Sequence, residues 1–154
     1  MGDAMKRILL VVVALAVSTC LSCAHVIIDS PIPLRGDGWE LTLKRLTDGP
    51  NSFGVGNTVY HPGDGERFIW AHVTLHNPAN APRKFSFDRC DLDAGNEGVV
   101  PAMVSFAFLN GDVNREPELA ADETIDRRLI FSYPMHQSPT RLRCAPMTVA
   151  LPQF

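Results

Sequence analysis

Four residues near the end of this 154-residue chain are of the types that bind copper. Blue-copper sites use two histidines, a cysteine and a weakly bound methionine, and the chain offers Met135, His136, Cys144 and Met147. His136 precedes the cysteine by eight residues, and no histidine follows it. A periplasmic copper-binding or copper-carrier protein is therefore an alternative function, and it requires a free thiolate at Cys144.

His72 and His76 are four residues apart, which on a helix would place both on one face for zinc. The residues around them alternate between apolar and other types, as on a β-strand. On a strand the two side chains share a face but lie about 13 Å apart, since each residue rises about 3.3 Å. One ion cannot bridge that separation, so we expect solvent-facing histidines and no zinc centre.

The other reactive residues form no catalytic pattern. The G-x-S-x-G motif of serine hydrolases is absent. Asp88, Asp91 and Asp93 precede a glycine turn, but they lack the spacing of a calcium-binding loop. We therefore predict no catalytic residue, no cofactor, no metal and no enzymatic activity. An uncharacterised hydrolase would need a concave pocket that places a base beside a nucleophile.

The stretch Glu66–Asn77 supplies the central strand of the predicted fold. Apolar residues occupy every second position, at Ile69, Ala71, Val73 and Leu75, and this period of two is typical of a strand with one buried face. Phe68 and Trp70 point to the other face. Exposed there, they could form a partner patch, but we favour the alternative, in which a loop covers this face.

Further strands are predicted at 39–46, 83–92, 103–109, 123–133 and 141–151, with a short strand at 58–60. Pro101 splits the apolar stretch 99–109, and a short helix is the alternative for 103–109. A shift in the alternation near Asp88 indicates a β-bulge. About seven strands without an amphipathic helix predict an all-β antiparallel sandwich over residues 39–154. Residues 24–38 are interpreted as a tether that leads into it.

The first 23 residues have the composition of a signal peptide. Lys6 and Arg7 give a positively charged start, and residues 8–17 are all apolar. This apolar run suits a secretory signal but is too short to span a membrane, which takes about 20 residues. We therefore expect export. The net charge of −3, without a basic block, predicts no nucleic-acid partner.

Residues 17–24 resemble a bacterial lipobox, in which a small residue precedes a cysteine that becomes the lipid-modified N-terminus. Ser22 suits this role before Cys23, whereas Cys20 follows Thr19, a poor residue there. We assign lipidation to Cys23, with Cys20 as the alternative and plain secretion as the remaining option. An acyl anchor would make the lipid membrane a partner.

Two further cysteines, Cys90 and Cys144, remain after such cleavage. In an oxidising compartment such a pair is expected to form a disulfide. Two free thiols or a zinc pair are the alternatives, although the C-x-x-C spacing of zinc sites is missing.

The order of these pieces resembles a family of exported bacterial immunoglobulin-like domains of unknown function. The matching stretches are 68–77, 85–92 with the turn at 95–98, 119–124, 129–134 and 147–151. Ala121-Asp122-Glu123 departs from the Pro-Gly-Glu usual in the family. The resemblance implies an immunoglobulin-like sandwich, similar in fold to a secreted mycobacterial immunogenic protein. Many members are lipoproteins, and the family brings no catalytic residues.

Together these features predict an exported, lipid-anchored cell-envelope protein with a non-catalytic, immunoglobulin-like binding or structural domain. Its expected partners are the lipid membrane and an envelope protein.

Overall fold

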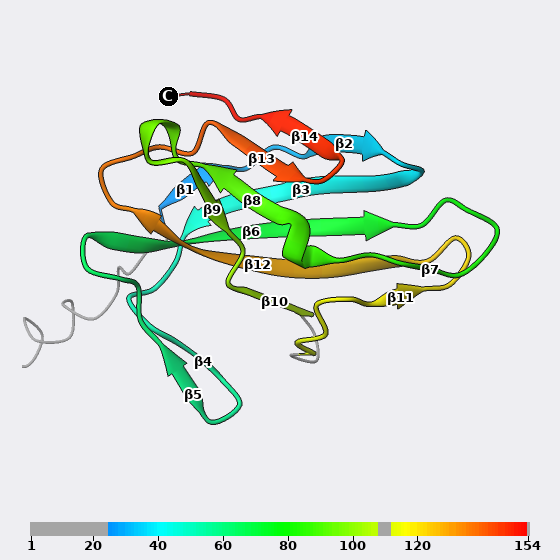
Figure 1. Ribbon diagram of the computed structural model, residues 1–154, viewed down its shortest axis with the longest axis horizontal. Helices are drawn as coiled ribbons and strands as arrows, with labels where there is room; N and C mark the ends of the chain where they lie inside the picture. The colour runs from blue at the N-terminus through cyan, green and yellow to red at the C-terminus, as the bar shows by residue number, and fades with distance from the viewer. Residues whose placement is uncertain (1–24, 108–111, 154) are drawn as a thin grey trace, which may run out of the picture.

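The computed structural model describes residues 25–107 and 112–153. Within them the chain forms fourteen strands and two short 3-10 turns, η1 and η2. The strands build two main antiparallel sheets that lie face to face (Figure 1). The predicted all-β antiparallel sandwich is confirmed. The predicted signal segment 1–23, with Cys20 and Cys23, lies outside the described residues.

The larger sheet has six strands in the order β1-β3-β6-β12-β10, and β2 also pairs with β3. Its members are β1 (Val26–Ile28), β2 (Ile32–Gly36), β3 (Trp39–Asp48), β6 (Glu66–His76), β10 (Val104–Ala107) and β12 (Thr124–Pro134). β6 pairs with β3 on one side and with β12 on the other. The stretch predicted as the central strand is therefore central.

The second main sheet has four strands in the order β14-β13-β8-β9. They are β8 (Cys90–Asp93), β9 (Val99–Pro101), β13 (Arg141–Cys144) and β14 (Met147–Ala150). Two small two-stranded sheets complete the fold: the hairpin of β4 (Phe53–Val55) with β5 (Thr58–Tyr60), and the pairing of β7 (Arg83–Lys84) with β11 (Glu118–Leu119), which are distant in sequence.

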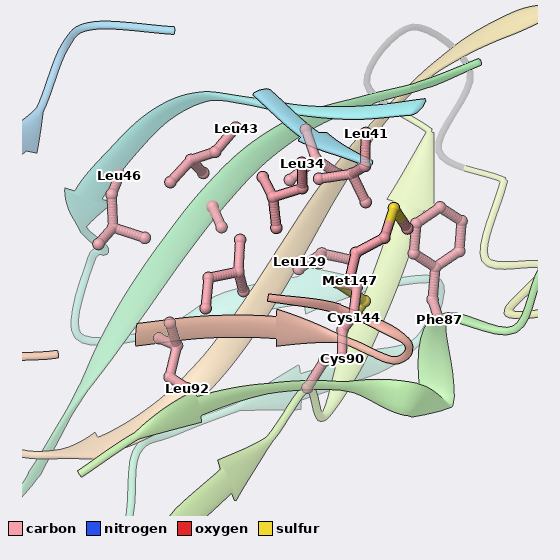
Figure 2. Close-up of a cluster of buried hydrophobic side chains, with 14 of the residues drawn as sticks. Leu34, Leu41, Leu43, Leu46, Phe87, Cys90, Leu92, Leu129, Cys144 and Met147 are labelled. Carbon is pink, nitrogen blue, oxygen red and sulfur yellow. A yellow bond between two sulfur atoms is a disulfide. The ribbon is translucent and has the colours of Figure 1, made fainter. Parts of the chain in front are cut away.

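The hydrophobic core fills the space between the two main sheets. The alternating residues Ile69, Ala71, Val73 and Leu75 of β6 are at most 1% exposed. In Figure 2, leucines of β2 and β3 point toward Leu92 and Met147 of the opposite sheet. Burial of apolar side chains is the main favourable term in folding, and here the period of two places them on the inner face.

The segment 24–38 is not a tether, which corrects the predicted domain boundary. Residues 26–28 form β1, which pairs with β3, and residues 32–36 form β2, which makes a hairpin with β3. Asp37 and Gly38 both have positive φ, at 52° and 69°. Such a pair is typical of the two-residue turns that join antiparallel strands.

One further expectation differs from the structure. The predicted bulge near Asp88 is wrong, because the 3-10 turn η1 (Phe87–Arg89) lies there between β7 and β8. The stretch 99–109 is split near Pro101 as expected, since β9 joins the second sheet and β10, a strand rather than a helix, joins the first. In the parts of the chain described, no helix has the length and hydropathy needed to cross a membrane.

Candidate functional site

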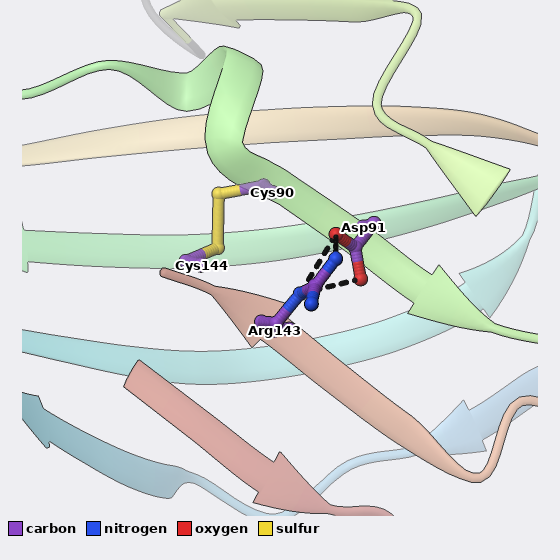
Figure 3. The surroundings of a disulfide bond; sticks show 4 residues. All are labelled: Cys90, Asp91, Arg143 and Cys144. Carbon is purple, nitrogen blue, oxygen red and sulfur yellow. Dashed lines mark hydrogen bonds and ion pairs between the residues drawn. A yellow bond between two sulfur atoms is a disulfide. The ribbon is translucent and has the colours of Figure 1, made fainter. Parts of the chain in front are cut away.

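The predicted cysteine pair is bonded in the structure. Cys90 on β8 and Cys144 on β13 are direct cross-strand partners, joined by a disulfide (Figure 3). Both residues are 0% exposed. Because copper would need the Cys144 thiolate, the disulfide removes the central ligand of the alternative copper site. The two methionines also differ in burial: Met147 lies in the core and is 1% exposed, whereas Met135 lies at the surface and is 51% exposed.

The three aspartates of this region each face a cation and not one another. Figure 3 shows Asp91 paired with Arg143, whose Nε and Nη2 donate to Oδ2 at 2.9 and 2.5 Å. The hydrogen bonds that Arg143 donates to this carboxylate raise the pKa of Arg143. Asp88 and Asp93 pair with arginines of other segments. Within 25–107 and 112–153, no three His, Cys, Asp or Glu side chains are placed to hold a metal ion.

The partner-patch alternative is wrong for Phe68, because the β4–β5 hairpin packs over it. Phe68 is 1% exposed and forms a second small apolar cluster with Val104 and Ile130. The Phe53 ring of the hairpin lies 4.9 Å from the Phe68 ring. Trp70 is half-buried, and Arg128 stacks on it at 4.4 Å. Covered in this way, Phe68 offers no contact surface to a partner.

The two strand histidines lie on the outer face of the larger sheet, half-buried, in different environments. His72 Nε2 accepts a 2.7 Å hydrogen bond from Arg128 Nε, and burial, together with the nearby arginine charge, lowers the pKa of His72. His76 lies between Asp122 and Glu40, whose carboxylates are 3.0 and 3.1 Å from its two ring nitrogens. Those hydrogen bonds raise the pKa of His76. A protonated imidazole donates from both ring nitrogens, so the two carboxylates favour the charged form of His76, and we call this arrangement the His76 clamp.

A cavity of about 340 Å³ lies where four segments of the chain meet. We call it the Arg83 pocket. It is lined by the β2–β3 turn, the β7–η1 segment, Glu116 and the β13–β14 turn, with Asp37, Trp39, Arg83, Lys84, Arg89 and Pro146 among the lining residues.

Arg83 is fixed in this pocket by three contacts. Its guanidinium stacks on the Trp39 ring at 4.7 Å. Its Nη1 and Nη2 donate to the backbone oxygens of Gly38 and Asp37 at 3.0 and 2.8 Å. Trp39 in turn packs edge-on against Phe85, with ring centroids 5.3 Å apart. The charge is thus held in place by neutral groups, and a guanidinium so oriented is preorganised for an anion.

The walls of the pocket are joined by the backbone next to the disulfide. Ala145 N donates to Arg89 O at 3.2 Å, and these two residues directly follow Cys144 and precede Cys90. Ser86 supplies the one hydroxyl of the lining. In the described part of the chain, Ser86 Oγ has no hydrogen bond to a histidine or a carboxylate. The pocket therefore has cations for binding and lacks the nucleophile–base contact of a hydrolase.

A second, wider groove of about 550 Å³ runs between β1 and the residues near the C-terminus. Its one arginine, Arg67, is neutralised, because Nη1 lies 3.0 Å from Asp48 Oδ1 and Nη2 donates to Gln137 O. The groove therefore lacks the uncompensated charge of the Arg83 pocket.

The sequence prediction missed the Arg83 pocket. Its parts come from residues 37–39, 83–89, 116 and 145–146, and no spacing rule connects them. One local signal was present, since Asp37-Gly38 between apolar runs is a strong hairpin indicator. That signal would have located one wall.

No protein-family model matches the sequence, and no curated protein matches it. Two solved structures resemble the fold. One is an uncharacterized β-sandwich protein from Clostridium difficile 630, with a TM-score of 0.50 and 14% identity over 77% of this chain and 85% of that chain. The other is a conserved hypothetical protein from Bacillus anthracis, with a TM-score of 0.52 and 14% identity over 77% and 88%. These likenesses place the chain among uncharacterised β-sandwich proteins by fold alone.

Proposed function

We propose that this protein is exported to the bacterial cell envelope, is anchored in a membrane by acyl groups on Cys23, and carries a non-catalytic, immunoglobulin-like binding domain. The anchor would hold it at the periplasmic or cell surface, where an envelope protein or small ligand could be bound. Export to the envelope is supported by the composition of residues 1–23 and by the resemblance to exported immunoglobulin-like domains.

The observation that carries the proposal is the fully buried disulfide between Cys90 and Cys144. Structural disulfides are rare in the reducing cytosol and common in exported proteins. The bond links β8 to β13 in the interior of the second sheet, where its role is structural. This supports maturation in an oxidising compartment.

The Arg83 pocket favours a binding role over a purely structural one. A domain that serves only as a structural spacer does not require a half-buried arginine that lines a cavity. The described lining also lacks a histidine or a cysteine, so its chemistry is that of charge recognition.

The test is the intact mass of the protein purified from a bacterial host that expresses the full chain. We expect a chain that begins at residue 23 and carries acyl groups, together with recovery in the membrane fraction. Cys23→Ser should abolish acylation, and Cys20→Ser is the matched control that should retain it. A full-length, unmodified chain in the cytosol would contradict the proposal. Acylation that is lost with Cys20→Ser would move the anchor to the alternative cysteine.

A further inference from the structure

We propose that the Arg83 pocket binds the anionic group of a small ligand, a carboxylate or a phosphate. This inference rests on the proposed binding role and names the ligand class of that site.

The distribution of unpaired cations is the first argument. Most arginines of the described residues lie within 4 Å of a carboxylate, including those at 35, 45, 67, 115, 127, 141 and 143. In that part of the chain, Arg83, Lys84 and Arg89 have no carboxylate partner, and all three line the pocket. Outside the pocket, Arg128 donates to His72 and stacks on Trp70, and Lys44 on β3 has no carboxylate of the described residues within 4 Å. Positive charge left uncompensated at one cavity attracts anions.

The Arg83 side chain is already held in a fixed orientation, which is the second reason to expect anion binding. A guanidinium carries five N–H donors, and the backbone oxygens of Asp37 and Gly38 use only part of that set. Stacking on Trp39 holds the plane of the group. Because this side chain is already ordered, a ligand would not have to fix it on binding, and such preorganisation favours affinity.

The carboxylates of the lining limit the ligand's charge. Asp37 and Glu116 stand against the three cations, so the formal balance is +3 − 2 = +1. A ligand with a single carboxylate or phosphate group suits this balance. A polyanion such as nucleic acid would be repelled by the carboxylates of Asp37 and Glu116. Phe85 and Pro146 add apolar wall for the uncharged part of the ligand.

The experiment uses the two tryptophans as reporters. The full chain, labelled with nitrogen-15 and purified in detergent micelles, is titrated with inorganic phosphate or with acetate while the indole N–H signals are followed. Trp39 lies in the pocket, and Trp70 lies on the outer face of the larger sheet. We expect a saturable shift of the Trp39 signal and no shift of the Trp70 signal. The stronger of the two probes identifies the anion class.

Charge variants test the assignment without disturbing the fold. Lys84 and Arg89 are exposed, so Lys84→Gln and Arg89→Gln should fold normally and weaken binding roughly three- to tenfold each. Lys44→Gln removes the same charge outside the pocket lining, five residues along β3 from Trp39, or about 16 Å at roughly 3.3 Å per residue. It is the control that should leave affinity unchanged. Absence of a saturable Trp39 shift with both probes, or an equal loss in Lys44→Gln, overturns the inference. Either result leaves the acylation measurement untouched, so the two proposals fail separately.

Discussion

The guanidinium of Arg83 ties the β2–β3 turn to a strand 46 residues further along the chain. It does so through the backbone oxygens of both turn residues, Asp37 and Gly38. Hydrogen bonds to charged groups contribute more than neutral ones, so one side chain both fixes the turn and shapes the pocket. Gly38 permits this approach because it has no side chain.

Gly38→Ala should lower the free energy of unfolding by about 1–2 kcal/mol, because φ is +69° there and a side chain is strained in that region. An added Cβ would also lie 2.8 Å from Arg83 Nη1. Urea denaturation measures the loss. Gly54→Ala is the control, since its Cβ would make only an ordinary 3.8 Å contact. Equal stability of the Gly38 variant and the wild type would contradict this role of the turn.

His76 should make stability fall as the pH rises from about 6.5 through the raised pKa of its folded state. Its pKa is raised by hydrogen bonds to Asp122 and Glu40, and Arg35 also pairs with Glu40. The unfolded imidazole titrates near about 6.5. The stabilisation is therefore complete below that pH, and it is lost as the pH rises through the raised pKa of the folded state.

The measurement is the free energy of unfolding across the range from slightly acidic to slightly alkaline pH. His72 does not interfere in the upper range, because its pKa is lowered and it is neutral there in both states. His76→Gln should flatten the decline, whereas His61→Gln, at an exposed position, should not. A decline that persists unchanged in His76→Gln would argue against the His76 clamp.

At the scale of elements, the β4–β5 hairpin covers part of the outer face of the larger sheet. In Figure 1 it extends from the sheet as a separate two-stranded arm. Phe53 stacks on Tyr60 within the hairpin at 5.0 Å and meets Phe68 of β6. A lone two-stranded hairpin is marginal in water, so these aromatic contacts with the sheet hold it.

Phe53→Ala should reduce the free energy of unfolding by about 2 kcal/mol, less than the roughly 3–5 kcal/mol of a fully buried phenylalanine, because Phe53 is half-buried. It should also expose Phe68 and increase binding of a hydrophobic dye. Val59→Ala, at a position 64% exposed on the same hairpin, should change stability by no more than about 0.5 kcal/mol. Similar losses in both variants would show that the hairpin does not depend on its aromatic side.

Elements with strong alternation could be predicted, and those decided by tertiary contacts could not. The predicted stretches 66–77 and 123–133 match β6 and β12 within a residue at each end, because one face of each is buried. β2 was missed because Pro31 and Pro33 suggested an irregular leader, yet proline is tolerated on a strand with a free edge. The burial of Phe68 depends on the β4–β5 hairpin, which packs over it. The alternation of residues in β6 does not predict that contact. The Arg83 pocket depends in the same way on contacts between segments remote in sequence.

At the scale of the whole molecule, the disulfide is the one covalent link between distant parts of the described chain. It joins residues 54 apart in sequence. The second sheet is built from short strands, so its cohesion depends more on this bond than that of the larger sheet does.

Replacing both cysteines, as Cys90→Ser with Cys144→Ser, should cost about 4 kcal/mol of unfolding free energy by the loop-entropy relation. Reductant should lower the stability of the wild type toward that of the double variant and leave the variant unchanged. Urea denaturation with and without reductant measures both effects. A wild type that is insensitive to reductant after complete reduction would contradict the expectation.

The position of this bond has a consequence for when the pocket becomes usable. Arg89 and Ala145, which line the cavity, are covalent neighbours of the two bonded sulfurs and hydrogen-bond to each other. A newly synthesised chain whose thiols are still reduced lacks the disulfide beside that wall of the pocket. Under the proposed export, this wall of the pocket would gain its covalent link only in the oxidising compartment, so the proposed anion site would be completed there.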